Sequence, residues 1–439
     1  MLADEDIRNW LSQVKTLPLP ADDPRHVQFF QPGTTAIDEI LSSIRYSEFD
    51  AGSVHLLSGP RGSGKSTELL RLQKDLQDLG FKAFVVDILD YVNPSSPLDI
   101  TQFLLAFGLA FADQVAAIDP TVVDPAQGFL VRFGRLLKRL NVTLDIGGVE
   151  LEASADGVEI GFAGQKVGFD FKRELKGSES FVAELRDRLS FHLGELRAEV
   201  AAFVKELATA VSHLPVVFIL DSMEKFRGTT ENDAEVQASV EALFVHHTDK
   251  LPFERLHVVY TVPPFLRIRN PAFAIHIGVG SIALIAAPKV KDFDGNPVDQ
   301  EAMSKFRDML NRRVPMAQLF ADQASVDRLI EMSGGNLRDL LRLAYQSIVL
   351  SAARRLDAPV SGEVADLAIA ALRREYQFTR EDREFLEKVR RDRGIANMTE
   401  VELPRFAKLL DTEVILGHMN GVEWYEVHPL ALDKLNPGS

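Results

Sequence analysis

The residues with the clearest chemical signature form a glycine-rich segment that ends in a lysine and two hydroxyl residues. It has the pattern G-x-x-x-x-G-K-[ST] and consists of Gly59, Pro60, Arg61, Gly62, Ser63, Gly64, Lys65, Ser66 and Thr67. Glycines let the backbone curl so that successive N–H groups point at a β-phosphate on the positive end of a helix. In such a loop Lys65 bridges the β- and γ-phosphates and the Ser66 hydroxyl ligates Mg²⁺. This phosphate loop (residues 59–67) therefore predicts binding of a nucleoside triphosphate.

Two carboxylates and a threonine follow apolar runs that are typical of buried strands. The run 216–220 is unbroken and ends in Asp221, where we expect the second Mg²⁺ ligand. Glu224 is a candidate general base that orients or polarises the attacking water. Thr261 ends the next apolar run and is a candidate hydrogen-bond partner of that water or of the γ-phosphate. The structural alternatives are a solvated carboxylate beside Lys225 and an ordinary threonine at a strand end.

Two arginines follow on a proline-rich connection that reads as exposed. From such a position Arg267 and Arg269 could reach the nucleotide of a neighbouring subunit. The alternative is a pair of ordinary surface arginines.

The elements around the phosphate loop predict an α/β fold. A short apolar run at 54–58 precedes the loop, a helical leucine pattern at 66–79 follows it, and a second apolar run occupies 82–88. Strand, helix and strand in about forty residues form a βαβ unit, which implies a parallel sheet covered by helices. The runs 256–262 and 282–287 are further strand candidates.

The segment between the two groups of site residues has a different pattern. Apolar residues alternate with polar or small ones from 142 to 171, which predicts a small antiparallel meander. A long amphipathic helix or helix pair follows at 178–213. We expect the insertion, about 141–213, to form a partner or self-association surface.

Four domains are expected along the chain. Residues 1–50 form an N-terminal lead with a short helix, and 51–290 form the sheet domain. Residues 298–360 form a helical lid. Residues 361–439 show helix, helix and hairpin patterns of the size of a winged-helix domain.

The order of these motifs resembles that of AAA+ P-loop ATPases. The lid segment Ser333–Leu343 contains Gly-Gly-Asn-Leu-Arg, in which we expect Asn336 to cap a helix. The segment is similar to that of origin-recognition and replication-initiator ATPases. The resemblance implies that Arg338 is the sensor 2 arginine acting on the γ-phosphate, that Asp221 is the Walker B aspartate, and that the cofactors are ATP and Mg²⁺. Asp221-Ser222-Met223-Glu224 is similar instead to the NACHT and wider STAND pattern, in which the acid comes three positions after the magnesium aspartate.

Composition and charge limit the classes of function. Of 439 residues, 49 are Lys or Arg and 64 are Asp or Glu, giving a net charge of −15, so nonspecific coating of DNA is not expected. The chain has no cysteine and no apolar N-terminal signal, which favours the cytoplasm. The apolar run 103–112 is too short to cross a membrane.

Three functions remain open from the sequence. The first is an ATP-driven switch that couples nucleotide state to homo-oligomerisation or to a protein partner. The second is a DNA-associated initiator, loader or transposition-type ATPase that contacts DNA through the winged helix, although residues 361–439 carry 11 Lys or Arg against 15 Asp or Glu. The third is a nucleotide-binding scaffold with little turnover.

Overall fold

The computed structural model describes residues 4–47, 52–118, 125–146, 149–150, 163–270, 272–276, 282–296, 298, 300–354, 360–420 and 422–435. The chain divides into two units. The first comprises Met1–Glu39, Ser58–Arg71 and Leu284–Ser439, and the second comprises Ile40–Leu57 and Leu72–Ala283. The phosphate loop therefore belongs to the first unit, together with the segment that contains Arg338, whereas Asp221, Glu224 and Thr261 belong to the second.

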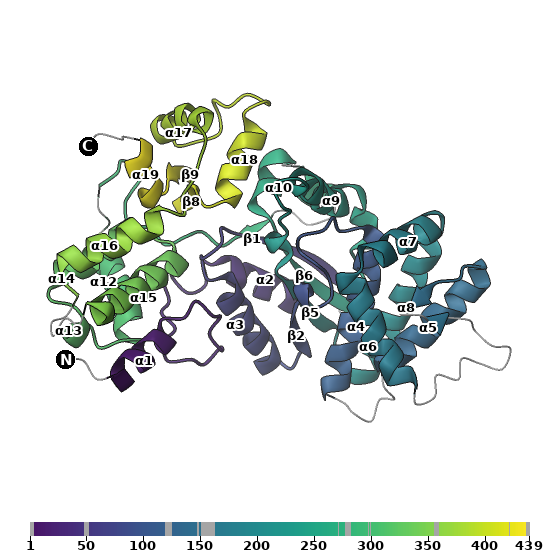
Figure 1. Cartoon of the computed structure of the whole chain (residues 1–439). Coiled ribbons are helices and arrows are strands. Elements are labelled where there is room, and N and C mark those ends of the chain that lie inside the picture. The colour runs from purple at the N-terminus through teal and green to yellow at the C-terminus, as the bar shows by residue number, and fades with distance from the viewer. Residues whose placement is uncertain are drawn as a thin grey trace. The chain divides into compact units, whose positions relative to one another are not determined.

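The apolar runs of the sequence form a five-stranded parallel sheet with the order β2-β5-β6-β1-β7 (Figure 1). Its strands are β1 (Ser53–Ser58), β2 (Ala83–Asp87), β5 (Val216–Asp221), β6 (Leu256–Val262) and β7 (Ala283–Leu284). All residues of β5 and β6 are buried, as expected for central strands whose two faces are both covered. The predicted α/β fold class is confirmed. The last candidate strand is shorter than expected, since only two residues of 282–287 belong to β7.

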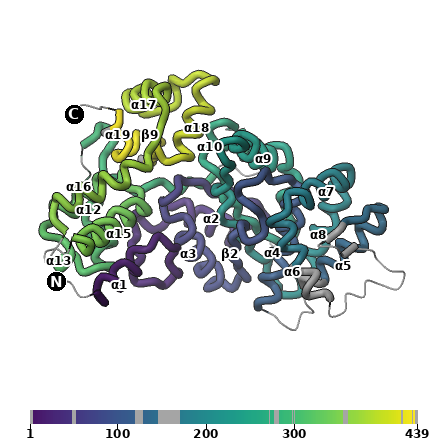
Figure 2. The backbone as a smooth tube through the Cα atoms, viewed as in Figure 1, coloured from purple at the N-terminus to yellow at the C-terminus, as the bar shows by residue number. Residues whose placement is uncertain are grey.

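Helices pack against one another in the second unit (Figure 2). Those that lie wholly in the second unit are α4 (Ile100–Ile118), α5 (Pro125–Leu140), α6 (Ala163–Gly177), α7 (Glu179–Leu189), α8 (Leu193–Val211), α9 (Asp233–His246), α10 (Pro264–Arg269) and α11 (Phe273–His276). Short 3₁₀ turns occur at Ile88–Asp90, Ser190–His192, Met223–Lys225 and Thr248–Lys250. Helices α2 (Ala36–Arg45) and α3 (Lys65–Asp78) each contribute residues to both units.

Helix α4 forms the apolar centre of the second unit. Among the described residues it alone is long and apolar enough to cross a membrane, but 78% of its most apolar window is buried within the protein. The rings of Phe107 and Phe111 lie 5.1 and 5.3 Å from that of Phe218 on β5. Helix α5 approaches α4 so closely that a β-carbon at Gly108 would lie 2.5 Å from the Phe129 ring. The run 103–112 is therefore a buried helix, as predicted.

The predicted meander at 142–171 is wrong for its last part. Residues 163–177 form helix α6, whereas 145–146 and 149–150 form the short antiparallel strands β3 (Asp145–Ile146) and β4 (Val149–Glu150). Residues 151–162, where another strand was expected, lie outside the described part of the chain. Phe171 and Leu175 are one helical turn apart and fully buried, and the Phe171 ring lies 5.7 Å from that of Phe133 on α5. Packing at the helical period thus overrides the local alternation.

The helix pair predicted at 178–213 is confirmed as α7 and α8. Ser178 caps α7 by accepting a hydrogen bond from the backbone N–H of Phe181. The Phe171 ring meets that of Phe181 at 5.9 Å, and the Phe203 ring on α8 meets that of Phe129 at 5.1 Å. These aromatic contacts join α6, α7 and α8 of the insertion to the preceding helix α5.

The first unit is mainly helical apart from a C-terminal hairpin. Its helices are α1 (Asp4–Gln13), α12 (Gln300–Asn311), α13 (Met316–Leu319), α14 (Gln323–Met332), α15 (Leu337–Ala353), α16 (Gly362–Arg373), α17 (Arg380–Asp392), α18 (Leu403–Asp411) and α19 (Pro429–Leu435). The hairpin is formed by β8 (Ile415–Asn420) and β9 (Val422–Val427). Helices α17 and α18 pack on it, and the Phe406 and Tyr425 rings meet at 4.8 Å. The predicted order of helix, helix and hairpin is present; α17, α18, β8, β9 and α19 are called the C-terminal module.

A half-buried serine in the second unit lies between two histidines from neighbouring strands. The Ser53 hydroxyl oxygen is 2.7 Å from both His55 Nε2 and His257 Nδ1. Burial lowers the pKa of both histidines to about 4, and each ring is neutral at neutral pH. The Ser53 hydroxyl can donate a hydrogen bond to one neutral ring and accept one from the other. If both rings are protonated, neither can accept its proton, and one of these hydrogen bonds is lost.

These histidines predict acid sensitivity of the second unit. Because the folded pKa lies below the ordinary value of 6.5, the unfolded chain binds more protons between pH 6.5 and 4, and stability falls as the pH drops through that window. Each histidine should cost up to about 3 kcal/mol by pH 4. Chemical denaturation between pH 4 and 7 should show a shallower pH slope for His257→Asn than for wild type. The exposed His246→Asn is the control; an unchanged slope in His257→Asn would contradict the assignment.

Candidate functional site

The phosphate loop has backbone geometry that its glycines make possible. Gly62 and Gly64 have φ angles of +74° and +93°, which side chains with a β-carbon rarely adopt. A β-carbon at Gly62 would also clash with the side-chain oxygen of Asn336. The loop leads directly into α3, a helix of 14 residues that begins at Lys65. The loop and the N-terminal turn of α3 thus have the arrangement that suits an anion such as a phosphate group.

The lysine of the loop is buried and directed at the loop backbone. Lys65 is 5% exposed, and its Nζ donates hydrogen bonds to the carbonyl oxygens of Gly59 at 2.8 Å and Pro60 at 3.0 Å. The Ser63 hydroxyl donates to the same Pro60 oxygen at 2.9 Å. The ammonium charge is therefore held beside the loop, where it can serve as a point charge for phosphate oxygens.

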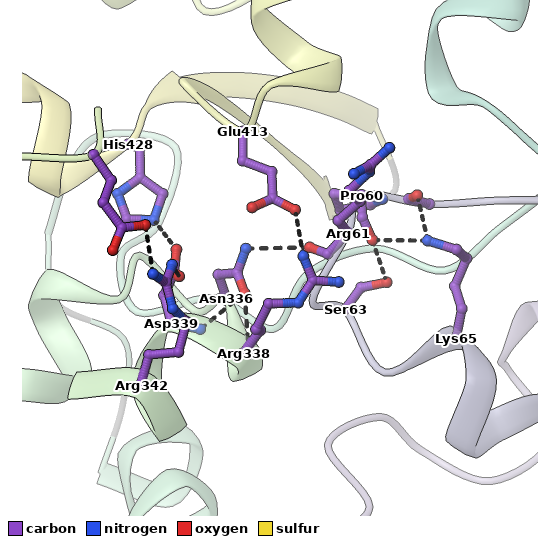
Figure 3. Close-up of polar contacts among 12 residues, drawn as sticks. Pro60, Arg61, Ser63, Lys65, Asn336, Arg338, Asp339, Arg342, Glu413 and His428 are labelled. Carbon is purple, nitrogen blue, oxygen red and sulfur yellow. Dashed lines mark hydrogen bonds and ion pairs between the residues drawn. The ribbon is translucent and has the colours of Figure 1, made fainter. Parts of the chain in front are cut away.

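The first residues of helix α15 bind the loop from the other side (Figure 3). The Asn336 side-chain N–H donates to the carbonyl oxygen of Arg61 at 3.1 Å, and the backbone N–H of Leu337 donates to that of Gly62 at 3.0 Å. The Asn336 oxygen also accepts from the backbone N–H groups of Arg338 and Asp339, which makes it the N-cap of α15. The predicted cap is confirmed, and the same side chain holds the phosphate loop.

Arg338 lies next to the phosphate loop, as its expected sensor role requires. Its β-carbon is 2.9 Å from the position that a β-carbon on Gly62 would take. Its Nη1 is 3.2 Å from the Glu413 carboxylate of the C-terminal module (Figure 3). The structure thus brings Arg338 and the loop together, about 275 residues apart in sequence.

The predicted residues of the second unit cluster where β5 ends. Asp221 and Glu224 are 6% and 4% exposed, and the Asp221 carboxylate accepts a hydrogen bond from the backbone N–H of Ser222 at 2.7 Å. Ser222 has a left-handed backbone with φ of +78°. This turn places two buried carboxylates three residues apart at the end of a central strand. Such strain in a serine is typical of functional turns.

Thr261 has a bonding role that the sequence does not reveal. Its hydroxyl accepts from the backbone N–H of Met223 at 3.0 Å and donates to the carbonyl oxygen of Leu220 at 3.2 Å. The side chain therefore braces the turn that carries Asp221 and Glu224. Sequence reasoning assigned it to water or the γ-phosphate, and the observed partners are both backbone groups.

The two arginines that follow lie on a short helix; Arg269 is exposed, as expected of this connection, and Arg267 is half-buried. Arg267 and Arg269 belong to α10, whose Pro264, Phe265, Leu266 and Ile268 are buried. The apolar residues anchor this short helix in the second unit. Arg269 forms an ion pair of 3.0 Å with Glu241 on α9.

An N-terminal strap (residues 19–31) was not singled out from the sequence as part of the site. Within the first unit, the backbone N–H of Leu19 donates to the Thr67 hydroxyl at 3.1 Å, and His26 Nε2 lies 3.0 Å from the Glu68 carboxylate. Arg312 at the end of the lid helix α12 donates to the carbonyl oxygen of His26 at 2.7 Å. The strap therefore connects the first turn of α3 to the lid. Its prolines were the one available signal.

The donor set can be compared with the needs of Mg²⁺ and a nucleotide. Mg²⁺ in nucleotide sites takes few protein oxygens and completes its shell with phosphate and water. Ser66 in the first unit and Asp221 in the second each carry an oxygen of the kind that Mg²⁺ binds. In the part of the chain that the structure describes, no three or more His, Cys, Asp or Glu side chains gather to hold a metal by themselves. The loop glycines form the cradle that a phosphate needs, so the loop and the Ser66 hydroxyl of the first unit suit a nucleotide phosphate with its Mg²⁺.

Comparisons with known proteins find structural similarity alone. No protein-family model matches the chain, and no curated protein matches it. Among solved structures, the Drosophila ORC bound to DNA is 10% identical with a TM-score of 0.39, covering 100% of this chain and 93% of that one. The Aeropyrum pernix ORC2 protein, in ADPNP-ADP complexes, is 10% identical with a TM-score of 0.40 and 96% coverage of both chains. At these values the similarity assigns no function, which must be argued from this chain's own residues.

Two substitutions of Asn336 should separate its two roles. Asn336→Ala removes both the cap and the bond to Arg61 and should lower the free energy of unfolding by about 1–2 kcal/mol. Asn336→Asp keeps the capping oxygen but sets a carboxylate oxygen against the Arg61 carbonyl, so its loss, about 1–3 kcal/mol, reports the bond to Arg61. Urea denaturation measures both losses. A loss below about 0.5 kcal/mol in Asn336→Asp would show that the bond to Arg61 contributes nothing.

Proposed function

We propose that the protein is an ATPase of the AAA+ type that binds ATP with Mg²⁺ at the phosphate loop and couples the nucleotide state to a change of conformation. One observation carries the proposal: a complete G-x-x-x-x-G-K-[ST] loop with left-handed glycines enters a long helix and is held by the N-cap of α15. Peptide N–H groups and a lysine then act together on the phosphates.

The proposal gives each residue a role. Lys65 binds the β- and γ-phosphates, and the oxygens of Ser66 and Asp221 bind Mg²⁺, which supplies charge neutralisation when bound. Glu224 orients the attacking water, and Arg338 binds the terminal phosphate. Thr261 acts by bracing the turn before Glu224.

A switch is favoured over a DNA-associated ATPase because of the charges on the C-terminal module. Four of its basic side chains lie within 4 Å of acidic ones on the same module: Lys388 with Glu402, Arg390 with Glu387, Arg391 with Asp392, and Arg405 with Glu381. Cations that already face carboxylates release fewer counterions on meeting a phosphate backbone. The DNA-associated alternative would be favoured if DNA stimulated the rate of ATP hydrolysis and if this stimulation fell steeply with salt concentration.

The partner in the switch is a second copy of the chain or another protein. We assign the contact surface to the insertion (about 141–213), whose described helices are α6, α7 and α8. Phe191, at the turn between α7 and α8, is 90% exposed there. Arg267 and Arg269 remain candidates for contact with a neighbouring subunit's nucleotide.

Substitution of the loop lysine tests the nucleotide site. Lys65→Ala should weaken binding of ATP with Mg²⁺ by about 100-fold or more in calorimetry, because a desolvated charge-assisted contact is removed. Lys74→Ala is the matched control, since Lys74 lies on the same helix and pairs with Asp78 at 2.9 Å. Equal affinities of Lys65→Ala and wild type would refute the proposal.

Substitution of Glu224 tests turnover against a scaffold role. Glu224→Gln should lower the rate of ATP hydrolysis by about 10²- to 10⁴-fold, since a general base is lost, while ATP affinity stays within about twofold. A phosphate-release assay measures the rate, and calorimetry measures the affinity. An unchanged, slow rate in Glu224→Gln would favour the scaffold.

A further inference from the structure

Four consecutive residues join the phosphate loop to the C-terminal module. Asn336 and Leu337 bind loop carbonyl oxygens. The next two side chains bind the C-terminal module instead: Arg338 lies 3.2 Å from Glu413, and Asp339 lies 3.2 Å from His428 (Figure 3). All four belong to the N-terminus of α15, so the loop and the module share one rigid element.

The turn that leads into these residues is tightly enclosed. Gly335 has a φ of +84°, and a β-carbon on it would clash with the carbonyl oxygen of Pro288. A β-carbon on Gly334 would lie 2.5 Å from Leu416 on β8 and 2.8 Å from Pro429 on α19. The start of α15 therefore lacks room to shift while the C-terminal module stays in place. Displacement of the C-terminal module would therefore shift Asn336 and Leu337, the residues that contact the phosphate loop.

Asp339 forms the fixed part of this junction. It is fully buried, accepts from the Tyr376 hydroxyl at 2.5 Å and lies 3.1 Å from Arg342. His428 Nδ1 accepts from the backbone N–H of Leu430, which places the ring proton on Nε2, opposite the Asp339 carboxylate. Burial opposes ionisation of Asp339, yet the hydrogen bonds from His428 and Tyr376 hold its pKa below the usual value. A buried network with this many partners specifies one docking position.

The Arg338–Glu413 contact is the exchangeable part. Arg338 is 35% exposed, so its guanidinium is free to exchange partners at low cost compared with the buried Asp339. Glu413 stands on the turn between α18 and β8 with a left-handed φ of +62°, rare for glutamate, and its side chain is 14% exposed. This strained turn directs the Glu413 carboxylate at the guanidinium of Arg338, whose β-carbon lies beside Gly62 of the phosphate loop. A terminal phosphate at that loop would offer the same guanidinium a competing anion.

We propose that Glu413 is a regulatory residue: docked as in this structure, the C-terminal module uses its carboxylate to withhold Arg338 from the terminal phosphate of the nucleotide. The inference rests on the proposed function and adds its regulation. Binding of ATP and release of Glu413 then favour each other, whereas ADP, which lacks the γ-phosphate that would compete, leaves the contact in place. By reciprocity, anything that displaces the module strengthens ATP binding by the same factor.

Calorimetry with ATP and ADP, both with Mg²⁺, tests the proposal on the full chain. Glu413→Gln should tighten ATP binding by about 5-fold or more and change ADP binding by less than about twofold. Glu375→Gln is the matched control, because it also removes a glutamate that pairs with an arginine of α15, at 2.5 Å from Arg342, and should leave the ATP-to-ADP affinity ratio unchanged. Glu413→Asn is the second variant, since asparagine adopts the left-handed backbone readily if Glu413→Gln folds poorly.

The double variant Arg338→Ala/Glu413→Gln distinguishes competition from simple charge repulsion. If Glu413 acts through Arg338, the gain in ATP affinity disappears when Arg338 is replaced. A gain that persists in the double variant, or an equal gain in Glu375→Gln, would overturn the proposal. If wild type itself bound no ATP, and Lys65→Ala did not differ from it, the nucleotide site itself would be refuted instead.

Discussion

The structure of the first unit depends on a short stretch of backbone pairing between the phosphate loop and the start of helix α15. The Leu337 N–H binds the Gly62 carbonyl oxygen, and Asn336 binds that of Arg61. These bonds form only if Gly62 lies in the left-handed region and has no side chain. The same constraint turns the N-terminus of α15 toward the loop, where a helix end favours anions.

This arrangement makes the lid and the C-terminal module parts of one chain of contacts. Asn336 meets the loop, Arg338 meets Glu413, and Asp339 meets His428. Because the contacts come from neighbouring residues on a single helix, a change at one of them affects the others, although the exposed Arg338 exchanges partners more readily than the buried Asp339. The second unit contributes a comparable arrangement at the end of β5, where Thr261 braces a strained turn that carries two buried carboxylates.

Local signals predicted most of the elements that carry these residues. The loop motif, the apolar strands at 54–58 and 216–220 and the leucine pattern of α3 were readable because each obeys a single period or turn rule. The segment that became α6 was misread, since its alternation fits a strand while Phe171 and Leu175 fit a helix equally well. Only neighbours from α5 and α7 decide between the two.

By itself, the sequence determined the phosphate loop, the strand that ends in Asp221, the parallel α/β class and the cap at Asn336, because these follow from residue types at fixed local spacings. The tertiary structure alone decided that Glu413 and His428 contact α15. It also decided that the Thr261 hydroxyl forms hydrogen bonds with backbone groups. Such contacts join residues tens to hundreds of positions apart, and no local periodicity records which distant side chains will be neighbours. The physical reason is that burial and packing, rather than propensity, select those partners.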